Sequence, residues 1–250
     1  MTPQIPGYLL SFESALLPLV AAIALGLIWM GAARMKAPAQ LRYATAGALS
    51  AALIAWLAAA QYLGAANAYF ASTEAFVPTL MFGLLIPVII AAIVLRLSGS
   101  VSSLVSAIPL PWLVAAQIYR VGGGIFLVLW ADGRLPWQFA LPAGFGDVAT
   151  GTFAVAVAVL LARNAAGARR AAYAWCLFGI ADLAVAVTMG ALTSPGPAHL
   201  FARAAPNLLI SSYPLVMVPT FAVPMALMLH GLVLWRLRRE TVSNARLAVA

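Results

Sequence analysis

The stretch ATAGALSAALIAWLAAAQYLGAA, residues 44–66, contains no charged side chain over its 23 positions. A helix that crosses the ~30 Å hydrocarbon core of a bilayer needs about 20 consecutive, mostly apolar residues. The apolar residues here form a continuous run, without the alternation at every second position that is typical of a transmembrane strand. The stretch therefore predicts a membrane-spanning α-helix, in which the backbone polar groups bond within the segment itself.

The rest of the chain repeats this pattern. Its 250 residues are 64% hydrophobic and only 8% charged, whereas a soluble domain is normally about one quarter charged. Seven stretches are long and apolar enough to cross a bilayer. We therefore predict an all-α fold, a seven-transmembrane helix bundle that forms one domain over residues 1–250. The predicted spans run over about 14–33, 44–66, 76–95, 105–131, 139–162, 171–191 and 213–235.

Basic residues are concentrated on one side of the predicted spans. Eleven of the fourteen lie after the first, third and fifth spans or in the C-terminal tail; Arg134 and Arg203 lie on the opposite side, and Arg120 lies inside a span. Because cytoplasmic flanks carry the excess of Lys and Arg, we expect the N-terminus outside and the C-terminus in the cytoplasm. The eleven are Arg34, Lys36, Arg42, Arg96, Arg163, Arg169, Arg170, Arg236, Arg238, Arg239 and Arg246.

The net charge of +8 does not indicate a nucleic-acid partner. The basic residues sit in short flanks beside apolar spans, where membrane topology and contact with anionic lipid account for them. We therefore expect the lipid bilayer as the partner and no nucleic acid. A membrane-protein partner and a homo-oligomer both stay open.

The sequence offers little support for a cofactor. Cys176, the only cysteine, lies in a predicted span and can form neither an internal disulfide nor a thiolate metal site. The length, helix number and orientation are similar to those of microbial rhodopsins, but the only lysine, Lys36, lies in a loop, so a covalent retinal is not expected. His230 lies in a span and His199 in an outer loop, which argues against a bis-histidine haem. No P-loop, HExxH or GxSxG motif indicates an enzyme.

Three ionisable residues, Arg120, Asp147 and Asp182, fall inside predicted spans. Counted at 1.5 Å per residue from the outer ends of their spans, all three lie about 15 Å deep, near the middle of the bilayer. An isolated charge at that depth costs several kcal/mol, so the three are expected to form one polar cluster. The formal sum is −1, and two crowded carboxylates disfavour ionising together, so one is expected to carry a proton.

Other polar residues are expected beside this cluster. Gln117 shares the face of Arg120 at i−3, Tyr119 adjoins it, and Gln61 and Tyr62 lie in the outer half of the second span, where they can line a cavity. The three ionisable residues Arg120, Asp147 and Asp182, together with Gln117, Tyr119 and Gln61, form our candidate substrate- or ion-binding site. The same ion pairs can instead be purely structural and hold three helices in register. We expect His230 to be packed between helices, and Glu13 and Glu74 to lie at outer span ends, where charge costs little.

Prolines and glycines interrupt several spans. The seventh span contains Pro214, Pro219 and Pro224, and each interior proline frees a carbonyl and kinks a helix. Such a kink is either a hinge at a functional site or a bend that only fits the helix to its neighbours. The glycines at 122–124 and at 144, 146 and 151 indicate that helices approach one another closely.

Two stretches carry a resemblance to a loose family of uncharacterised bacterial multi-pass membrane proteins. They are QIYRVGGGIF, residues 117–126, of the form QxYRxGGxxF, and LPAGFGDVATG, residues 141–151, of the form LPAGxGDxxxG. The resemblance implies a multi-pass protein of the bacterial inner membrane. It brings no assigned activity and covers the fourth and fifth spans best.

Three functional interpretations follow from the sequence. The first is a small transporter, channel or binding protein, coupled to a proton or an ion, in which Arg120 holds an anionic group and Asp147 or Asp182 carries a proton or binds a cation. The second is a structural or anchoring subunit of a larger membrane complex. The third, an intramembrane enzyme that acts on lipids, has the least support, because no nucleophile–base pair or metal set is visible.

Overall fold

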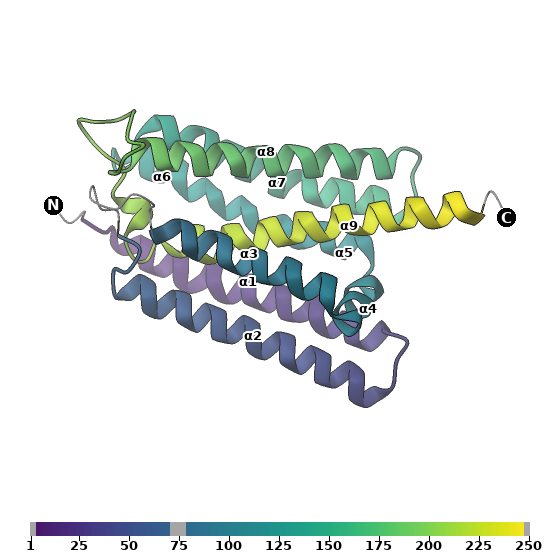
Figure 1. Ribbon diagram of the computed structural model, residues 1–250. Helices are drawn as coiled ribbons and strands as arrows, with labels where there is room; N and C mark the ends of the chain where they lie inside the picture. The colour runs from purple at the N-terminus through teal and green to yellow at the C-terminus, as the bar shows by residue number, and fades with distance from the viewer. Residues whose placement is uncertain (1–3, 71–78, 248–250) are drawn as a thin grey trace.

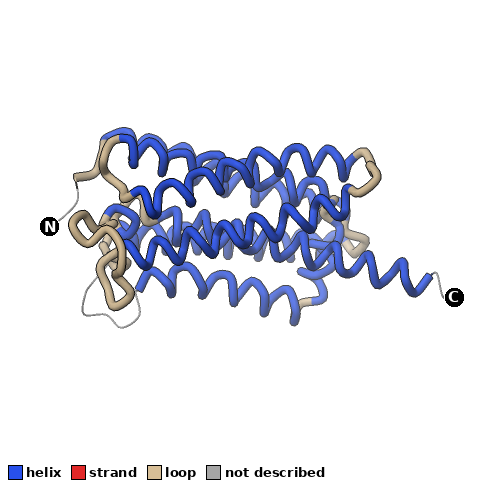
Figure 2. The backbone as a smooth tube through the Cα atoms, turned by 90° about the horizontal axis from the view of Figure 1, so that it is seen from above, coloured by secondary structure: helices blue, strands red, loops and turns tan. Residues whose placement is uncertain are grey.

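A computed structural model describes residues 4–70 and 79–247, with side chains up to residue 239. Within these ranges the chain forms helices and no strand, and the long helices lie side by side in a bundle with the two termini at opposite ends (Figures 1 and 2). Seven helices or helix runs are long and apolar enough to cross a membrane. The prediction of an all-α fold with seven such helices is confirmed.

The first three of these helices are continuous: α1 (Gly7–Arg34), α2 (Ala39–Ala65) and α3 (Thr79–Leu97). The first two are longer than the predicted spans, because the helices extend several residues beyond their apolar segments. Residues 76–78, the predicted start of the third span, lie outside the described residues, as does Glu74. Helix α3 has Leu84 as its one buried residue, so most of its apolar surface faces away from the protein.

The fourth span begins later than its predicted start at residue 105. Residues 99–107 form a separate short helix, α4 (Gly99–Ala107), whose first turn is capped by the Ser98 hydroxyl, which accepts from the Val101 amide at 3.3 Å. The chain then turns at Pro109 and starts α5 (Leu110–Ala115). Proline disfavours helical backbone in the residue before it, which explains the break that the apolar pattern did not show.

The fourth span is also not a uniform α-helix. After α5 the chain forms a nine-residue 3₁₀ segment, η1 (Ala116–Gly124), before it returns to α-helix in α6 (Ile125–Ala131). A 3₁₀ run longer than three or four residues is uncommon and often marks a functional or strained segment. Three residues per turn place Gln117, Arg120 and Gly123 on one face of η1.

Two regular helices, α7 (Trp137–Ala162) and α8 (Ala168–Thr193), form the fifth and sixth spans. The seventh begins at Val218 and not at residue 213 as predicted, because residues 213–216 form a turn after the short η2 (Leu209–Ser211). It starts with a π-helical turn, η3 (Val218–Ala222), which contains Pro219, and continues as α9 (Val223–Leu247). Single π turns in helices are frequent at functional sites.

The helices pack around α9. Helices α1, α2 and α4 pack together, α7 packs against α8 and against the α5–η1–α6 run, and α9 contacts α3, α5, α8 and η1. Figure 1 shows α9 running through the middle of the bundle. The side chains of Val233 and Leu237 on α9 are fully buried. The centre of the bundle therefore brings together η1, α7, α8 and α9.

Basic residues at the α4 end of the bundle also donate hydrogen bonds to backbone carbonyls of other helices and turns. One guanidinium nitrogen of Arg236, Nη1, donates to the carbonyl oxygens of Val105 at 3.0 Å and Ile108 at 2.7 Å, and also to that of Ser106. Arg169 donates from Nη2 to the carbonyl of Leu237 at 2.8 Å. These carbonyls lie at or near the end of α4 and in α9, and the last carbonyls of a helix lack partners within it. Some of the residues attributed to topology therefore also join helices to one another.

Candidate functional site at the centre of the bundle

Arg120 on η1 lies between the carboxylates of Asp147 on α7 and Asp182 on α8. Its Nε and Nη2 each lie 2.7 Å from Oδ1 of Asp147, and Nη2 also donates to Oδ2 of Asp182. The exposed fractions of the three side chains are 2% for Arg120, 14% for Asp147 and 6% for Asp182. The predicted contiguous cluster of these three residues is confirmed, and Asp147 is its most accessible member.

The third guanidinium nitrogen of Arg120 points to α8 and α9. Nη1 lies 3.4 Å from the carbonyl oxygen of Gly179 and 3.2 Å from Nε2 of His230. A guanidinium can only donate, so Nε2 of His230 is the acceptor and the ring proton is on Nδ1. Trp175 packs against the histidine ring with a centroid separation of 4.7 Å. All three nitrogens of the Arg120 guanidinium are therefore engaged.

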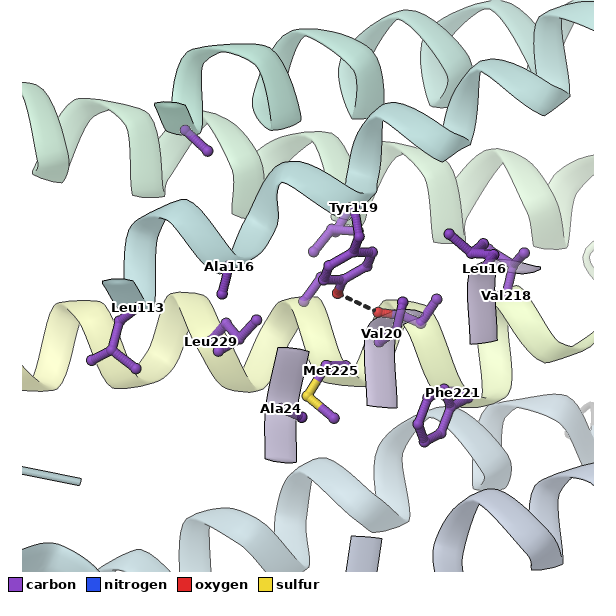
Figure 3. Close-up of a cluster of buried hydrophobic side chains, with 14 of the residues drawn as sticks. Leu16, Val20, Ala24, Leu113, Ala116, Tyr119, Val218, Phe221, Met225 and Leu229 are labelled. Atoms are coloured by element: carbon purple, nitrogen blue, oxygen red, sulfur yellow. Dashed lines mark hydrogen bonds between the residues drawn. The ribbon is translucent and has the colours of Figure 1, made fainter. Parts of the chain in front are cut away.

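Two neighbouring residues of η1 hold this segment against the seventh span. The Tyr119 hydroxyl donates to the carbonyl of Ala222 at 2.9 Å, a bond drawn as a dashed line in Figure 3, and the Gln117 amide donates to the carbonyl of Ala226 at 3.0 Å. Both side chains are buried, and Figure 3 shows that of Tyr119 among apolar residues of α1, η3 and α9. Their side chains bond to backbone, which gives Gln117 and Tyr119 a positioning role for Arg120.

The cluster needs glycine on the facing helices. A Cβ atom added at Gly123 would overlap the side chain of Asp147, one at Gly146 would overlap the carboxylate of Asp182, and one at Gly179 would overlap the imidazole of His230. A Cβ at Gly151 would come within 2.7 Å of the Val121 amide nitrogen. The glycines expected to allow close helix packing thus also make room for the charged side chains themselves.

Two cavities adjoin the cluster, and Asp147 lines both. The smaller, about 20 Å³, lies beside Arg120 and Tyr119, a volume sufficient for about one water molecule. The larger, about 300 Å³, lies between α3 and α8 and extends to residues 194–198 and 210–211 at the end of the bundle that carries the N-terminus. Arg120 is not among the residues that line the larger cavity. Asp147 is therefore the member of the cluster that a molecule in that cavity would meet.

Three polar residues lie elsewhere than expected. Gln61 is half-buried on α2 and lines neither of these two cavities, and Tyr62 beside it is 75% exposed. Neither residue therefore lines the two cavities beside the cluster, and the assignment of Gln61 to a binding site stays a prediction. Glu13 on α1 is 3% exposed, and neither of its carboxylate oxygens has a hydrogen-bond partner in the described part of the chain. The expectation that a charge at Glu13 costs little free energy is therefore wrong.

His230 is the main residue of the site that the sequence did not identify as part of it. Its level in the seventh span is about four residues, or ~6 Å, from that of Arg120, which suggested a separate packed histidine. An arginine side chain can reach over that distance, and Nη1 of Arg120 does so. The sequence signal that could have identified His230 is its distance from Arg120 along the membrane normal, which is no longer than one arginine side chain.

Comparison with known proteins gives the chain a family but no function. A search of curated proteins and a search of solved structures each return no match. A family model, described as a domain of unknown function (DUF8737), matches residues 75–238. This match covers all the residues of the central cluster and more than half of the chain. The chain therefore belongs to the DUF8737 family.

Proposed function

We propose that this chain is a polytopic membrane transporter in which Asp147 holds either a proton or a cation. In this proposal the N-terminus is outside, the C-terminus is in the cytoplasm, and the cavity opens toward the outside. Support for the orientation comes from the excess of basic residues at the end of the bundle that carries α4 and the C-terminus. We place the protein in the bacterial inner membrane, as the resemblance of its two central motifs implies.

The charge balance of the site supports the exchange of one positive charge. Arg120 contributes +1 and the two aspartates contribute −2 when ionised, while His230, which accepts a hydrogen bond from Arg120, is neutral. A net charge of −1 is expensive inside a bilayer. One proton on a carboxyl or one bound monovalent cation neutralises the site, and the two compete for the same position.

The observation that carries the proposal is the position of Asp147. It is the one residue of the ion-paired cluster that lines the larger cavity, and its side chain is about twice as exposed as that of Asp182. Asp182 also pairs with Arg120 and lines neither of the two cavities. We therefore assign the exchange to Asp147 and a holding role to Arg120 and Asp182.

Proteoliposomes with an entrapped pH-sensitive dye test this function. When each member of a panel of inorganic and organic monovalent cations is added outside, exchange of a cation for a proton makes the interior more alkaline for at least one member. Asp147→Asn abolishes the signal, because the amide carries no charge to exchange. Ala184→Leu, at an exposed position on α8, retains it.

The proposal is contradicted if no cation in the panel moves protons through the wild-type protein, or if Asp147→Asn leaves the movement unchanged. A stoichiometric protein partner that copurifies with an inactive chain would then favour the subunit interpretation.

A further inference from the structure

The larger cavity has the dimensions of a small ligand. Its volume of about 300 Å³ reaches the lower limit of the range for small-molecule pockets. Small side chains on the α8 face toward α3, notably Ala186 and Gly190, leave this space unfilled. The cavity reaches from the loop at residues 194–198 down to Asp147, so it joins the end of the bundle to the middle.

Among the residues that the structure describes, the lining of the cavity is mostly apolar and has one carboxylate, that of Asp147. Leucine, alanine, valine and proline side chains dominate it, and Tyr69, Phe126 and Phe139 contribute aromatic rings. Phe126 and Phe139 pack edge to face with a centroid separation of 5.1 Å. No arginine, lysine or histidine is among the described residues that line it. Aromatic faces together with a carboxylate attract organic cations, and quaternary ammonium groups in particular.

Other ligand classes fit this lining less well. An anion would meet Asp147 without a facing basic side chain, because Arg120 is almost fully buried and engaged by two carboxylates. A hard inorganic cation such as Ca²⁺ requires six to eight oxygen ligands. Besides Asp147, the described part of the lining offers the side-chain hydroxyls of Tyr69, Ser194 and Ser211. A neutral apolar molecule would leave the net charge of −1 at the cluster uncompensated.

We propose that the cavity between α3 and α8 binds a small, mostly apolar organic monocation, with its cationic group beside Asp147. The apolar part of the ligand lies against the aromatic and aliphatic lining toward residues 194–198. This inference rests on the proposed function, since it names the class of cation that Asp147 exchanges.

Direct binding to the full chain in lipid nanodiscs tests the ligand class. The probe is radiolabelled benzyltrimethylammonium, a small monocation that combines a quaternary ammonium group with an apolar aromatic ring. Neopentylbenzene has nearly the same shape without the charge, and phenylmethanesulfonate carries the opposite charge. We expect both to compete at least about tenfold more weakly than the unlabelled cation, because only the cation gains from the carboxylate and the ring faces.

Three variants distinguish binding of the probe in the cavity from binding elsewhere on the protein. Asp147→Asn should weaken binding of the probe about 10- to 100-fold, the range for loss of one interaction with a charged group. Ala186→Leu fills the cavity without touching the cluster and should also abolish binding. Ala184→Leu makes the same change at an exposed position two residues away and should leave binding intact.

Equal competition by neopentylbenzene, or full binding in both Asp147→Asn and Ala186→Leu, would overturn the inference. Should Asp147→Asn fail to fold, Ala186→Leu against Ala184→Leu still decides it. The failure of the ligand class is separable from the failure of the transporter. Proton movement driven only by inorganic cations would reject an organic cation here while the proposed exchange at Asp147 stands.

Discussion

Arg120 is the residue on which the centre of the bundle depends. It faces two carboxylates, a backbone carbonyl and a neutral imidazole, and only 2% of its side chain is exposed. Removing one partner of a buried ion pair costs about 3–5 kcal/mol, because the remaining charge stays buried without compensation. Removal of any one charged member of the cluster is therefore expected to destabilise the protein, because the other charges stay buried without compensation.

We expect Arg120→Ala to destabilise the protein more than Arg120→Ala combined with Asp182→Asn. The single change leaves two facing carboxylates without a counter-charge, whereas the double change removes one of them. Thermal unfolding of the detergent-solubilised variants measures the difference, which should be several degrees in favour of the double variant. Additive destabilisation by the two changes would show that Arg120 and Asp182 are not energetically coupled.

At the scale of the element, irregular helices position the site. The 3₁₀ turn of η1 aligns Gln117 with Arg120, and the π turn of η3 contains the Ala222 carbonyl that Tyr119 uses. On α7, Gly146 leaves the space that the Asp182 carboxylate occupies. Glycine is needed there for clearance rather than for a left-handed backbone.

Gly146→Ala should lower the unfolding temperature, since the added methyl group must displace the Asp182 carboxylate from its pair with Arg120. Overpacking of this kind costs about 1–3 kcal/mol. The matched control is Gly26→Ala on α1, where a Cβ meets nothing within 4 Å. That change should be neutral or stabilising by up to ~1 kcal/mol, because alanine is the better helix former. Similar losses for both variants would contradict the clearance argument.

The sequence predicted the long helices well and the irregular segments poorly. Continuous apolar runs indicated all seven spans, and equal depth in three of them was enough to bring Arg120, Asp147 and Asp182 together. Neither pattern reports local backbone geometry, so the break at Pro109 and the late start at Val218 were missed. Burial of Glu13 was missed because it depends on which helices surround α1, which a depth count does not contain.

At the scale of the whole molecule, we expect the chain to cross the membrane an odd number of times, with the cavity facing outside. A reporter fused after Arg239 should read cytoplasmic, and one inserted at Ser194, beside the cavity, should read external. The reason is the excess of basic residues at the end opposite the cavity. Paired enzymatic reporters, each active on one side only, make the measurement. A cytoplasmic signal at Ser194 would contradict both the seven-span arrangement and the outward cavity.

The central claim is that Asp147 carries the exchangeable positive charge of the cluster. Infrared difference spectra of the membrane-embedded protein between acidic and alkaline pH report the carbonyl band of a protonated carboxyl directly. Asp182→Asn serves as a comparison within the cluster, and Glu13→Gln accounts for the other buried carboxyl. We predict a titrating carboxyl band in the wild type that persists in Glu13→Gln and disappears in Asp147→Asn. A band that is unchanged in Asp147→Asn and lost in Glu13→Gln would contradict the account.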